Sequence, residues 1–392
     1  MNKQRSTLIV KRILLFFFLL AYSYANESKN TSYGSAEHKT LAEFKITKNG
    51  GPILLPVTFN GKEHLFVLDT GSSHTAYDKS LRHELGKVKR IENALTFGSP
   101  IKTEVYDAPD AFLGPLNLKN SNEIFCLDLK MLSLIDGKTI SGIIGMNFLK
   151  RHIIQIDFDQ GTLSFLQPVE DQHPDWGIEL LLKFDTPGWP YITGEILESI
   201  NTNFVIDTGS NSTGALGSDI FEKNISEKKP KTSKTLFATA SGVIQNRECR
   251  IDSFSIGSFE YKELIFSEAN WSCLGLLFLS RHTVTFDFPG SRIYLKKGKD
   301  FKKMDETDMS GLHLLRIANQ TVIYSVDENS PAQKAGIVPK DIILKINEKD
   351  AGKYDMWELR RLLMSEDKKK ITMTIKQGEN VKDVAFQLEK KI

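Results

Sequence analysis

Two copies of the tetrapeptide Asp-Thr-Gly-Ser stand far apart in this sequence, at residues 69–72 and 207–210. Each copy follows a short apolar run, in FVLDTGSSHTA at residues 66–76 and in FVIDTGSNSTG at residues 204–214. A single copy would be compatible with an ordinary strand end and turn, because Asp, Gly and Ser are common turn residues. The second copy in a matching context indicates that Asp69 and Asp207 act together.

The chemistry of such a pair follows from the behaviour of two neighbouring carboxyl groups. An apolar strand that ends in an acid can place that acid at the floor of a cleft, and two such strands can bring two acids face to face. Two adjacent carboxylates do not both ionise readily, so the pair holds one proton and titrates as a unit. The ionised acid can take a proton from water while the protonated acid donates to a peptide carbonyl. We therefore predict that Asp69 and Asp207 are catalytic and hydrolyse peptide bonds.

The elements that must position these acids also recur. GIIGMNFLKRHIIQIDFDQGTLSFL (142–166) parallels CLGLLFLSRHTVTFDFPGSRIYLK (273–296), and AFLGPLNLKNSNEIF (111–125) resembles SFSIGSFEYKELIF (253–266). Such self-similarity predicts two lobes of one plan. Asp157 and Asp287 repeat as well, but their positions in predicted hairpins favour a structural role.

Turn signals and alternating apolar residues predict that both lobes are rich in β-structure. Hairpins are expected around Asn60-Gly61, near residues 159–161 and at Pro289-Gly290, because Asn-Gly and Pro-Gly pairs favour tight turns. Short helices are expected at residues 145–151 and 216–223. The predicted fold class is mostly β.

With these residues in place, the chain resembles the aspartic proteases of the pepsin and retropepsin type over about residues 40–300. The resemblance implies two β-barrel lobes that form a bilobal acid protease with no cofactor. It makes Asp69 and Asp207 the catalytic dyad, and it implies support of the catalytic loops by Thr70 and Thr208 as a brace, Gly71 and Gly209 as close-approach positions, and Ser72 and Ser210 as hydroxyl donors to the carboxylates. The segments 143–145 and 273–275 are expected to pack behind the loops.

The same resemblance implies a flap, a hairpin that closes over the substrate. The candidate turns are Gly98-Ser99 in the first lobe and Ser241-Gly242 in the second, and the sequence leaves open which of them acts. Tyr106 gives no secure match to a flap tyrosine. Tyr106 and Trp271 are expected in the core, although either could line a cleft.

A third unit follows, and it resembles a PDZ domain over residues 311–390, with an α+β fold. The resemblance places a carboxylate-binding loop at Gly311, Leu312, His313 and Leu314, and a helix from Met356 to Ser365 as the second wall of a peptide groove. Such domains bind a peptide as an added strand. The alternative is a packing module docked on the protease. Residues 301–310 are predicted to be a linker.

The N-terminus predicts an export signal. Lys3, Arg5, Lys11 and Arg12 precede the apolar run 13–21, and small residues at 23 and 25 are typical of a cleavage site. The predicted boundaries are therefore a signal peptide at 1–25, a flexible N-terminus at 26–39, a first lobe at 40–167 and a second lobe at 168–300. The apolar run is shorter than the ~20 residues of a membrane span, so no stable membrane insertion is expected after cleavage. An uncleaved anchor is the alternative.

Charge and composition limit the kinds of partner, disulfide and metal site that can be expected. The 392 residues include 51 basic and 49 acidic side chains, and a formal charge of +2 gives no electrostatic reason to expect a nucleic-acid partner. The three cysteines (Cys126, Cys249, Cys273) allow at most one intramolecular disulfide. Neither they nor the eight histidines form a metal-ligand spacing, so no metal site is expected.

Together these patterns predict an exported, periplasmic or secreted aspartic endopeptidase whose site is complete in one chain, so that dimerisation is not required. Its partners would be polypeptide substrates and, through the PDZ unit, C-terminal peptides. Asn211 lies in an Asn-Ser-Thr glycosylation signal beside the second acid, which favours a bacterial exporter that does not attach glycans there. The alternatives are a catalytically silent peptide-binding scaffold and a quality-control factor that selects substrates by their C-termini.

Overall fold

A computed structural model describes residues 39–48, 50–96, 99–168, 174–197, 200–239 and 242–392. The chain divides into the units Met1–Lys39 and Thr40–Ile392, and everything below concerns the second unit. The predicted signal peptide and nearly all of the predicted flexible N-terminus lie outside the described residues. None of the helices within the described ranges is both long and apolar enough to cross a membrane.

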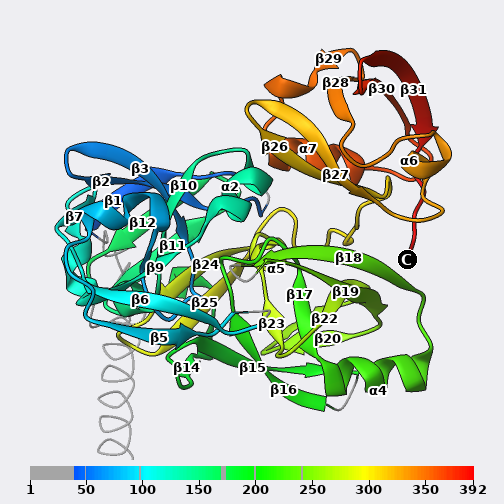
Figure 1. Ribbon diagram of the computed structural model, residues 1–392. Helices are drawn as coiled ribbons and strands as arrows, with labels where there is room; N and C mark the ends of the chain where they lie inside the picture. Colours follow the sequence, from blue (N-terminus) through cyan, green and yellow to red (C-terminus); the bar gives the residue numbers. More distant parts are fainter. Residues whose placement is uncertain (1–38, 49, 97–98, 169–173, 198–199, 240–241) are drawn as a thin grey trace, which may run out of the picture. The chain divides into compact units, whose positions relative to one another are not determined.

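The first lobe is built on one sheet of nine strands (Figure 1). Their order is β5 (Arg90–Ala94), β6 (Ile101–Asp107), β9 (Glu123–Leu127), β4 (Ala76–Asp78), β10 (Ile140–Ile144), β3 (Lys62–Leu68), β2 (Leu54–Phe59), β7 (Ala111–Leu113) and β8 (Leu116–Asn117). The predicted Asn60-Gly61 turn joins β2 to β3, and both residues have positive φ, 49° and 73°. This is the conformation that a two-residue hairpin turn requires and that Asn-Gly adopts readily.

The second lobe repeats the strand order of the first. Its sheet runs β18 (Thr232–Thr239), β19 (Gly242–Ile251), β22 (Leu264–Ala269), β17 (Gly214–Gly217), β23 (Cys273–Leu274), β16 (Ile200–Ile206), β15 (Pro190–Ile196), β20 (Phe254–Ile256) and β21 (Phe259–Tyr261), with β14 (Lys183–Phe184) beside β15. Parallel pairs occur at matching places, β3 with β10 and β16 with β23. The predicted duplication is therefore present in the topology.

A third sheet of six strands joins the lobes. Its order is β1 (Thr40–Lys45), β12 (Thr162–Leu166), β11 (Ile153–Asp157), β24 (His282–Asp287), β25 (Arg292–Lys297) and β13 (Ile178–Leu181). The repeated hairpins β11–β12 and β24–β25 meet antiparallel at its centre. The side chains of Asp157 and Asp287 each accept a backbone N–H within their own turn, at 2.9 Å, as a structural role requires.

The C-terminal domain has its own sheet. It contains β26 (Leu312–Ile317), β27 (Gln320–Val326), β28 (Ile342–Ile346), β30 (Lys370–Gln377) and β31 (Asn380–Gln387), with β29 (Lys349–Asp350) paired to β28. Helix α7 (Met356–Leu363) lies where the sequence predicts a helix. The residues of the predicted linker are fixed to the second lobe, because the buried carboxylate of Asp305 pairs with Arg281 and accepts the N–H of Ile265.

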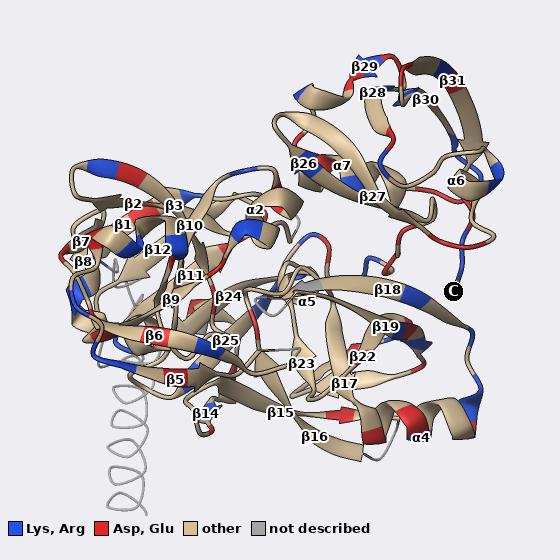
Figure 2. Ribbon diagram, viewed as in Figure 1, with Lys and Arg blue, Asp and Glu red and all other residues tan. Residues whose placement is uncertain are grey.

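The helices are short. They are α2 (Lys130–Asp136), α3 (Met146–Leu149), α4 (Ser218–Lys228), α5 (Leu276–Leu279), α6 (Pro331–Lys334) and α7, with 3-10 turns η1 (Lys79–Glu84), η2 (Leu118–Ser121), η3 (Pro174–Trp176) and η4 (Ala351–Lys353). The predicted helices at 145–151 and 216–223 correspond to α3 and α4, and the mostly β prediction is confirmed. Figure 2 shows acidic and basic residues spread over both lobes and the C-terminal domain.

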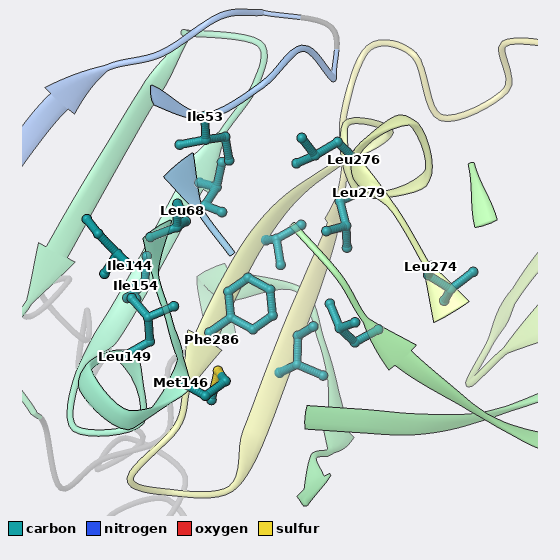
Figure 3. Packing of buried hydrophobic residues seen from close by; sticks show 14 of the residues in the cluster. Ile53, Leu68, Ile144, Met146, Leu149, Ile154, Leu274, Leu276, Leu279 and Phe286 are labelled. Atoms are coloured by element: carbon teal, nitrogen blue, oxygen red, sulfur yellow. The ribbon is translucent and has the colours of Figure 1, made fainter. Parts of the chain in front are cut away.

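Buried apolar side chains from both lobes and from the joining sheet form one continuous cluster, whereas the C-terminal domain has a separate one. Figure 3 shows part of the shared cluster, with Leu68 and Ile144 toward one side and Leu276 and Leu279 toward the other. Each such side chain contributes about 1.5–3 kcal/mol when fully buried. This shared core fixes the two acid-bearing strands in one framework.

Candidate active site

Each predicted catalytic acid directly follows a central strand. β3 lies between β2 and β10, and β16 lies between β15 and β23. The last three residues of both strands are buried, which explains why these runs are continuously apolar. The backbone N–H of Asp69 donates to the carbonyl of Ile144 (3.1 Å), and that of Asp207 donates to Leu274 (2.9 Å). The two acids therefore leave their sheets in the same way.

The structure brings the carboxyl groups of Asp69 and Asp207 together, so that each affects the ionisation of the other. Oδ1 of Asp69 accepts the N–H of Gly71 (2.8 Å), and Oδ1 of Asp207 accepts the N–H of Gly209 (2.9 Å). Asp207 is buried and Asp69 is half-buried. Each loop thus orients its own acid and presents it to the other loop.

Each loop requires a glycine, Gly71 or Gly209, because the acid of the other loop lies directly against it. A Cβ atom on Gly71 would lie 2.6 Å from Cγ of Asp207, and one on Gly209 would lie 2.5 Å from Cγ of Asp69. Cβ atoms in proteins essentially never lie within 3.0 Å of a heavy atom to which they are not bonded. Any side chain at either position would force the two acids apart.

The two threonines cross-link the loops in a reciprocal network. The N–H of Thr70 donates to Oγ1 of Thr208, and the N–H of Thr208 donates to Oγ1 of Thr70, both at 3.0 Å. The hydroxyls then donate across the lobes, from Thr70 to the carbonyl of Ile206 (2.5 Å) and from Thr208 to the carbonyl of Leu68 (2.9 Å). Thr70 and Thr208 are 1% and 0% exposed, so these bonds form away from water.

The serine hydroxyls do not make the predicted contacts with the carboxylates. Oγ of Ser72 donates to the carbonyl of His74 at 2.8 Å, and Oγ of Ser210 lies 2.9 Å from Oγ of Ser212. The backbone N–H groups of Ser72 and Ser210 donate to the main-chain carbonyls of Asp69 and Asp207, both at 3.3 Å. The loop conformation aims main-chain donors at the carboxylates and turns the side chains toward their own loops.

The apolar-Gly segments do pack behind the loops. A Cβ on Gly145 would lie 2.3 Å from the carbonyl oxygen of His74, and one on Gly275 would lie 2.4 Å from that of Ser212. The residues that follow these glycines, Met146 and Leu276, donate backbone hydrogen bonds of 2.8 Å to the carbonyls of Ser72 and Ser210. These equal distances reflect the duplication of the site.

Burial governs the electrostatics of the dyad. It raises the pKa of Asp69 well above the ordinary value, with the neighbouring charge of Asp207 adding to the effect. It also raises the pKa of Asp207 to about 6, against the opposing hydrogen bond from Gly209. The pair therefore keeps a shared proton under conditions in which exposed aspartates are ionised.

This gives the free energy of unfolding a pH dependence with a defined sign. Burial raises the folded-state pKa of Asp207. The contribution of Asp207 to the free energy of unfolding is therefore fully present below pH ~4 and is lost as pH rises through about 6. Asp207→Asn removes that loss, so the variant should gain about 3 kcal/mol relative to the wild type between pH 4 and pH 7. Urea unfolding at several pH values measures the difference. Parallel pH profiles for the two proteins would show that Asp207 does not carry this effect.

The dyad opens into a cavity of about 590 Å³ that is lined by both lobes. The hairpins β5–β6 and β18–β19 border it through residues 92–96 of the first lobe and through Leu236, Phe237 and Val243 of the second. Gly98 and Ser241, in the two predicted flap turns, lie outside the described residues. A hairpin of suitable position therefore exists in each lobe, and the choice between them stays open.

The two aromatic residues considered for the cleft lie elsewhere. Tyr106 is 1% exposed in the first-lobe core, and its hydroxyl donates to Glu104 at 2.6 Å. Trp271 packs with the ring of Trp189, 5.1 Å away between centroids, in a second-lobe cluster. Both observations agree with the core role that was expected.

The predicted carboxylate loop of the C-terminal domain has internal partners. The N–H groups of Ser310 and Gly311 donate to Oδ1 of Asp308 at 3.0 and 2.6 Å, and the N–H of Leu312 donates to Oγ of Ser310 at 3.0 Å. Leu312, His313 and Leu314 begin strand β26 and also line the cavity that holds the dyad. The loop therefore borders the cavity that holds Asp69 and Asp207, and its first N–H group already has the Asp308 carboxylate as a partner.

Sequence reasoning missed two contributors to the cavity. Helix α2 supplies Leu132, Ile135 and Asp136, and His74 lies beside them with its ring stacked on Phe125 at 4.2 Å. The segment KMLSLID was too short to show a helical period, and His74 has no counterpart in the second lobe. Its position directly after the first Asp-Thr-Gly-Ser-Ser was the available signal.

The part of the chain that the structure describes holds no group of three or more His, Cys, Asp or Glu side chains placed to bind a metal ion. All three cysteines carry free thiols and are buried. Burial raises the pKa of each thiol, which keeps them protonated and unreactive.

Two lobes of one plan, each contributing an Asp-Thr-Gly loop to a shared cavity, have the bilobal architecture that the resemblance to aspartic proteases implies. Comparison with known families agrees. Residues 55–148 and 192–277 match the family model described as aspartyl protease, and residues 322–377 match that of the PDZ domain. The matches fall on the two lobes and on the C-terminal sheet, so the resemblance to aspartic proteases and to a PDZ domain is confirmed.

Single proteins match over shorter stretches. A probable CtpA-like serine protease of Staphylococcus saprophyticus is 30% identical over 97 residues, which is 24% of this chain and 20% of that protein. One of the same name from Staphylococcus aureus strain N315 is 31% identical over 80 residues, or 20% of this chain and 16% of that protein. The chain thus matches about a fifth or less of the length of these relatives.

Solved structures give similarly partial matches. A retropepsin-like aspartic protease from Rickettsia conorii matches with a TM-score of 0.25 and 23% identity, over 30% of this chain and 89% of that one. The photosystem II D1 C-terminal processing protease matches with a TM-score of 0.20 and 17% identity, over 21% of this chain and 23% of that one.

Proposed function

We propose that this protein is an exported aspartic endopeptidase that hydrolyses polypeptides by means of Asp69 and Asp207. The observation that carries this proposal is the adjacent pair of carboxyl groups at the cavity, each oriented by the N–H of the glycine in its own loop. One chain supplies both acids, so catalysis does not require a dimer.

In the proposed reaction, a substrate peptide lies in the cavity with its carbonyl carbon next to a water molecule between the two acids. The ionised carboxylate takes a proton from this water, the new hydroxide attacks the carbonyl carbon, and the protonated acid donates its proton to the carbonyl oxygen. The resulting gem-diol collapses when the acid that took the water proton passes it to the amide nitrogen, while the other carboxylate takes a proton from one of the diol hydroxyls. The C–N bond then breaks, and the pair again holds one proton.

The PDZ domain is proposed to recruit polypeptides as an added strand next to β26, a mode that this domain type uses widely. Export to a periplasmic or extracellular space is proposed from residues 1–25, and a bacterial setting from Asn211, which lines the cavity where a glycan would obstruct substrate. The free, buried thiols show that the described fold stands without a disulfide.

The experiment that tests the activity is incubation of the purified protein with an unfolded polypeptide from pH 3 to pH 8, followed by mass spectrometry of the products. Cleavage by the wild type and its loss in Asp207→Ala would support the proposal. Tight peptide binding without cleavage at any pH would favour the silent scaffold.

A matched control addresses the serine protease names of the partial relatives. Oγ of Ser73 lies 3.0 Å from Nδ1 of His74 at the edge of the cavity, which is a contact between a hydroxyl and a potential base. Ser73→Ala should retain the cleavage activity within about threefold if the acids do the chemistry. Loss of activity in Ser73→Ala, together with inactivation by a phosphonofluoridate, would replace the aspartic mechanism with a serine one.

A further inference from the structure

The peptide groove of the C-terminal domain is defined by β26 and α7. β26 stands at one end of the sheet order, and Met356 and Leu359 of α7 belong to the same apolar cluster as Leu312 and Leu314 of β26. The N–H of Met309, just before this strand, donates to the carbonyl of Leu363 at the end of α7 (3.1 Å). A peptide bound as an added strand would lie between these two elements.

Helix α2 of the first lobe packs along β26 and against α7. Nη2 of Arg360, on α7, donates to the carbonyl oxygen of Ile135 at 2.7 Å and so caps the last turn of α2. Nζ of Lys138 lies 2.8 Å from Oδ2 of Asp355, the residue that caps α7 at its N-terminus. Elements on both sides of the groove are therefore engaged by one segment of the first lobe.

The contact is close enough to exclude even a methyl group at two points. A Cβ on Gly137, which ends α2 with φ +71°, would lie 2.8 Å from Cγ of Met356 and 3.2 Å from Cβ of Arg316. A Cβ on Gly51 would lie 2.6 Å from Cδ1 of Trp357 and 2.6 Å from Cγ2 of Thr47 in the first lobe. These glycines let the backbone of the first lobe touch β26 and α7 directly.

The same helix forms part of the catalytic cavity. Leu132, Ile135 and Asp136 line it, and Leu132 packs on the first-lobe cluster that contains Phe125 and Ile143. All four apolar side chains of α2 are half-buried. A helix with this composition is held by what packs on either side of it, because seven residues are too few for independent stability.

We propose that α2 is the resident occupant of the groove between β26 and α7, and that a polypeptide entering this groove displaces it. Occupancy of the PDZ domain and the shape of the catalytic cavity are then coupled through one helix. This proposal rests on the proposed peptide-binding role of the PDZ domain, and it makes the groove a competition site between α2 and an extended, apolar polypeptide. The apparent affinity for such a polypeptide is reduced by the fraction of molecules in which α2 is docked.

The test weakens the docking of α2 and measures binding to the groove. Gly137→Ala and Gly51→Ala each place a methyl group against α7 or β26 from a different segment, so each checks the other for folding. Gly61→Ala is the matched control, since Gly61 has φ +73° and nothing within 4 Å of an added Cβ. All variants carry Asp69→Asn, which prevents cleavage of the probe, a fluorescein-labelled decapeptide with three apolar residues and a free carboxylate at its C-terminus.

By fluorescence anisotropy, we expect the dissociation constant to fall at least about tenfold in Gly137→Ala and Gly51→Ala and to stay unchanged in Gly61→Ala. Equal affinities in all proteins, or no binding in any of them, would overturn the proposal. In the Asp69→Asn protein with its native glycines, saturation with the probe should accelerate hydrogen exchange of the α2 amides. Unchanged exchange there would overturn the coupling. Because neither readout is cleavage, both are independent of the proposed peptidase activity.

Discussion

Asp69→Asn is expected to lower kcat/KM for peptide cleavage by at least about 10³-fold while the protein remains folded. An amide can still accept the 2.8 Å hydrogen bond from Gly71, so the loop geometry should persist. It cannot take a proton from water or supply one to a carbonyl oxygen, so the shared-proton mechanism is lost. The measurement is the rate of cleavage of a quenched fluorescent peptide, with the thermal midpoint recorded on the same preparation.

Asp157→Asn provides the matched control for this prediction. Asp157 is also an acid repeated in both halves of the chain, but its Oδ1 accepts the N–H of Gln160 in a hairpin turn (2.9 Å), a bond that Asn can retain. We expect the control to keep its activity within about twofold. Equal losses in the two variants would mean that the effect is structural, and full activity in Asp69→Asn would remove the acid dyad from the mechanism.

The duplication made the positions of the acids predictable. Because equal spacing and equal sequence context demand equal local structure, the two Asp-Thr-Gly loops, the glycines behind them and the hairpins β11–β12 and β24–β25 could all be located in the sequence. The way in which these segments assemble could not be predicted. The shared six-stranded sheet depends on pairing between residues more than a hundred positions apart, such as Ile153 with Asp287, and no local pattern encodes that pairing.

The prediction for the hydroxyl groups of Ser72 and Ser210 was wrong for a local reason. The motif predicted serine hydroxyls at the carboxylates, but motif spacing does not specify χ1, and both hydroxyls bond within their own loops. Likewise, the sequence around Gly311 indicated a loop shape that can hold a carboxylate. It could not reveal that Asp308, three residues earlier, accepts the N–H of Gly311, or that Oγ of Ser310 accepts the N–H of Leu312.

Helix α2 shows the limit of periodicity as a signal. The seven residues KMLSLID make only about two helical turns and cannot be distinguished from a short apolar strand, since both patterns fit four apolar residues in seven. Its helical state is fixed by tertiary contacts, including the one from Arg360, which lies 225 positions away along the chain. Residues that connect the cavity around Asp69 and Asp207 with the C-terminal domain are therefore the ones that sequence alone reveals least.

Thr208→Val is expected to destabilise the protein by about 2–5 kcal/mol, the second large effect that the site predicts. Valine has the shape of threonine but no hydroxyl, so the N–H of Thr70 and the carbonyl of Leu68 both lose the partners they had at 3.0 and 2.9 Å. Each buried polar group without a partner costs about 1–3 kcal/mol. The free energy of unfolding from urea titration measures the loss.

Thr208→Ser is the control that keeps the hydroxyl group and removes only the methyl group of the side chain. Serine keeps both hydrogen bonds and loses one methyl group, which should cost about 1 kcal/mol. Because the hydroxyl joins the second loop to the strand that carries Asp69, the valine variant should also lose at least about tenfold in kcat as the acids lose their alignment. Serine should restore most of that rate. Equal stability of the valine and serine variants would show that the reciprocal network does not hold the lobes together, and that the shared apolar core alone aligns the dyad.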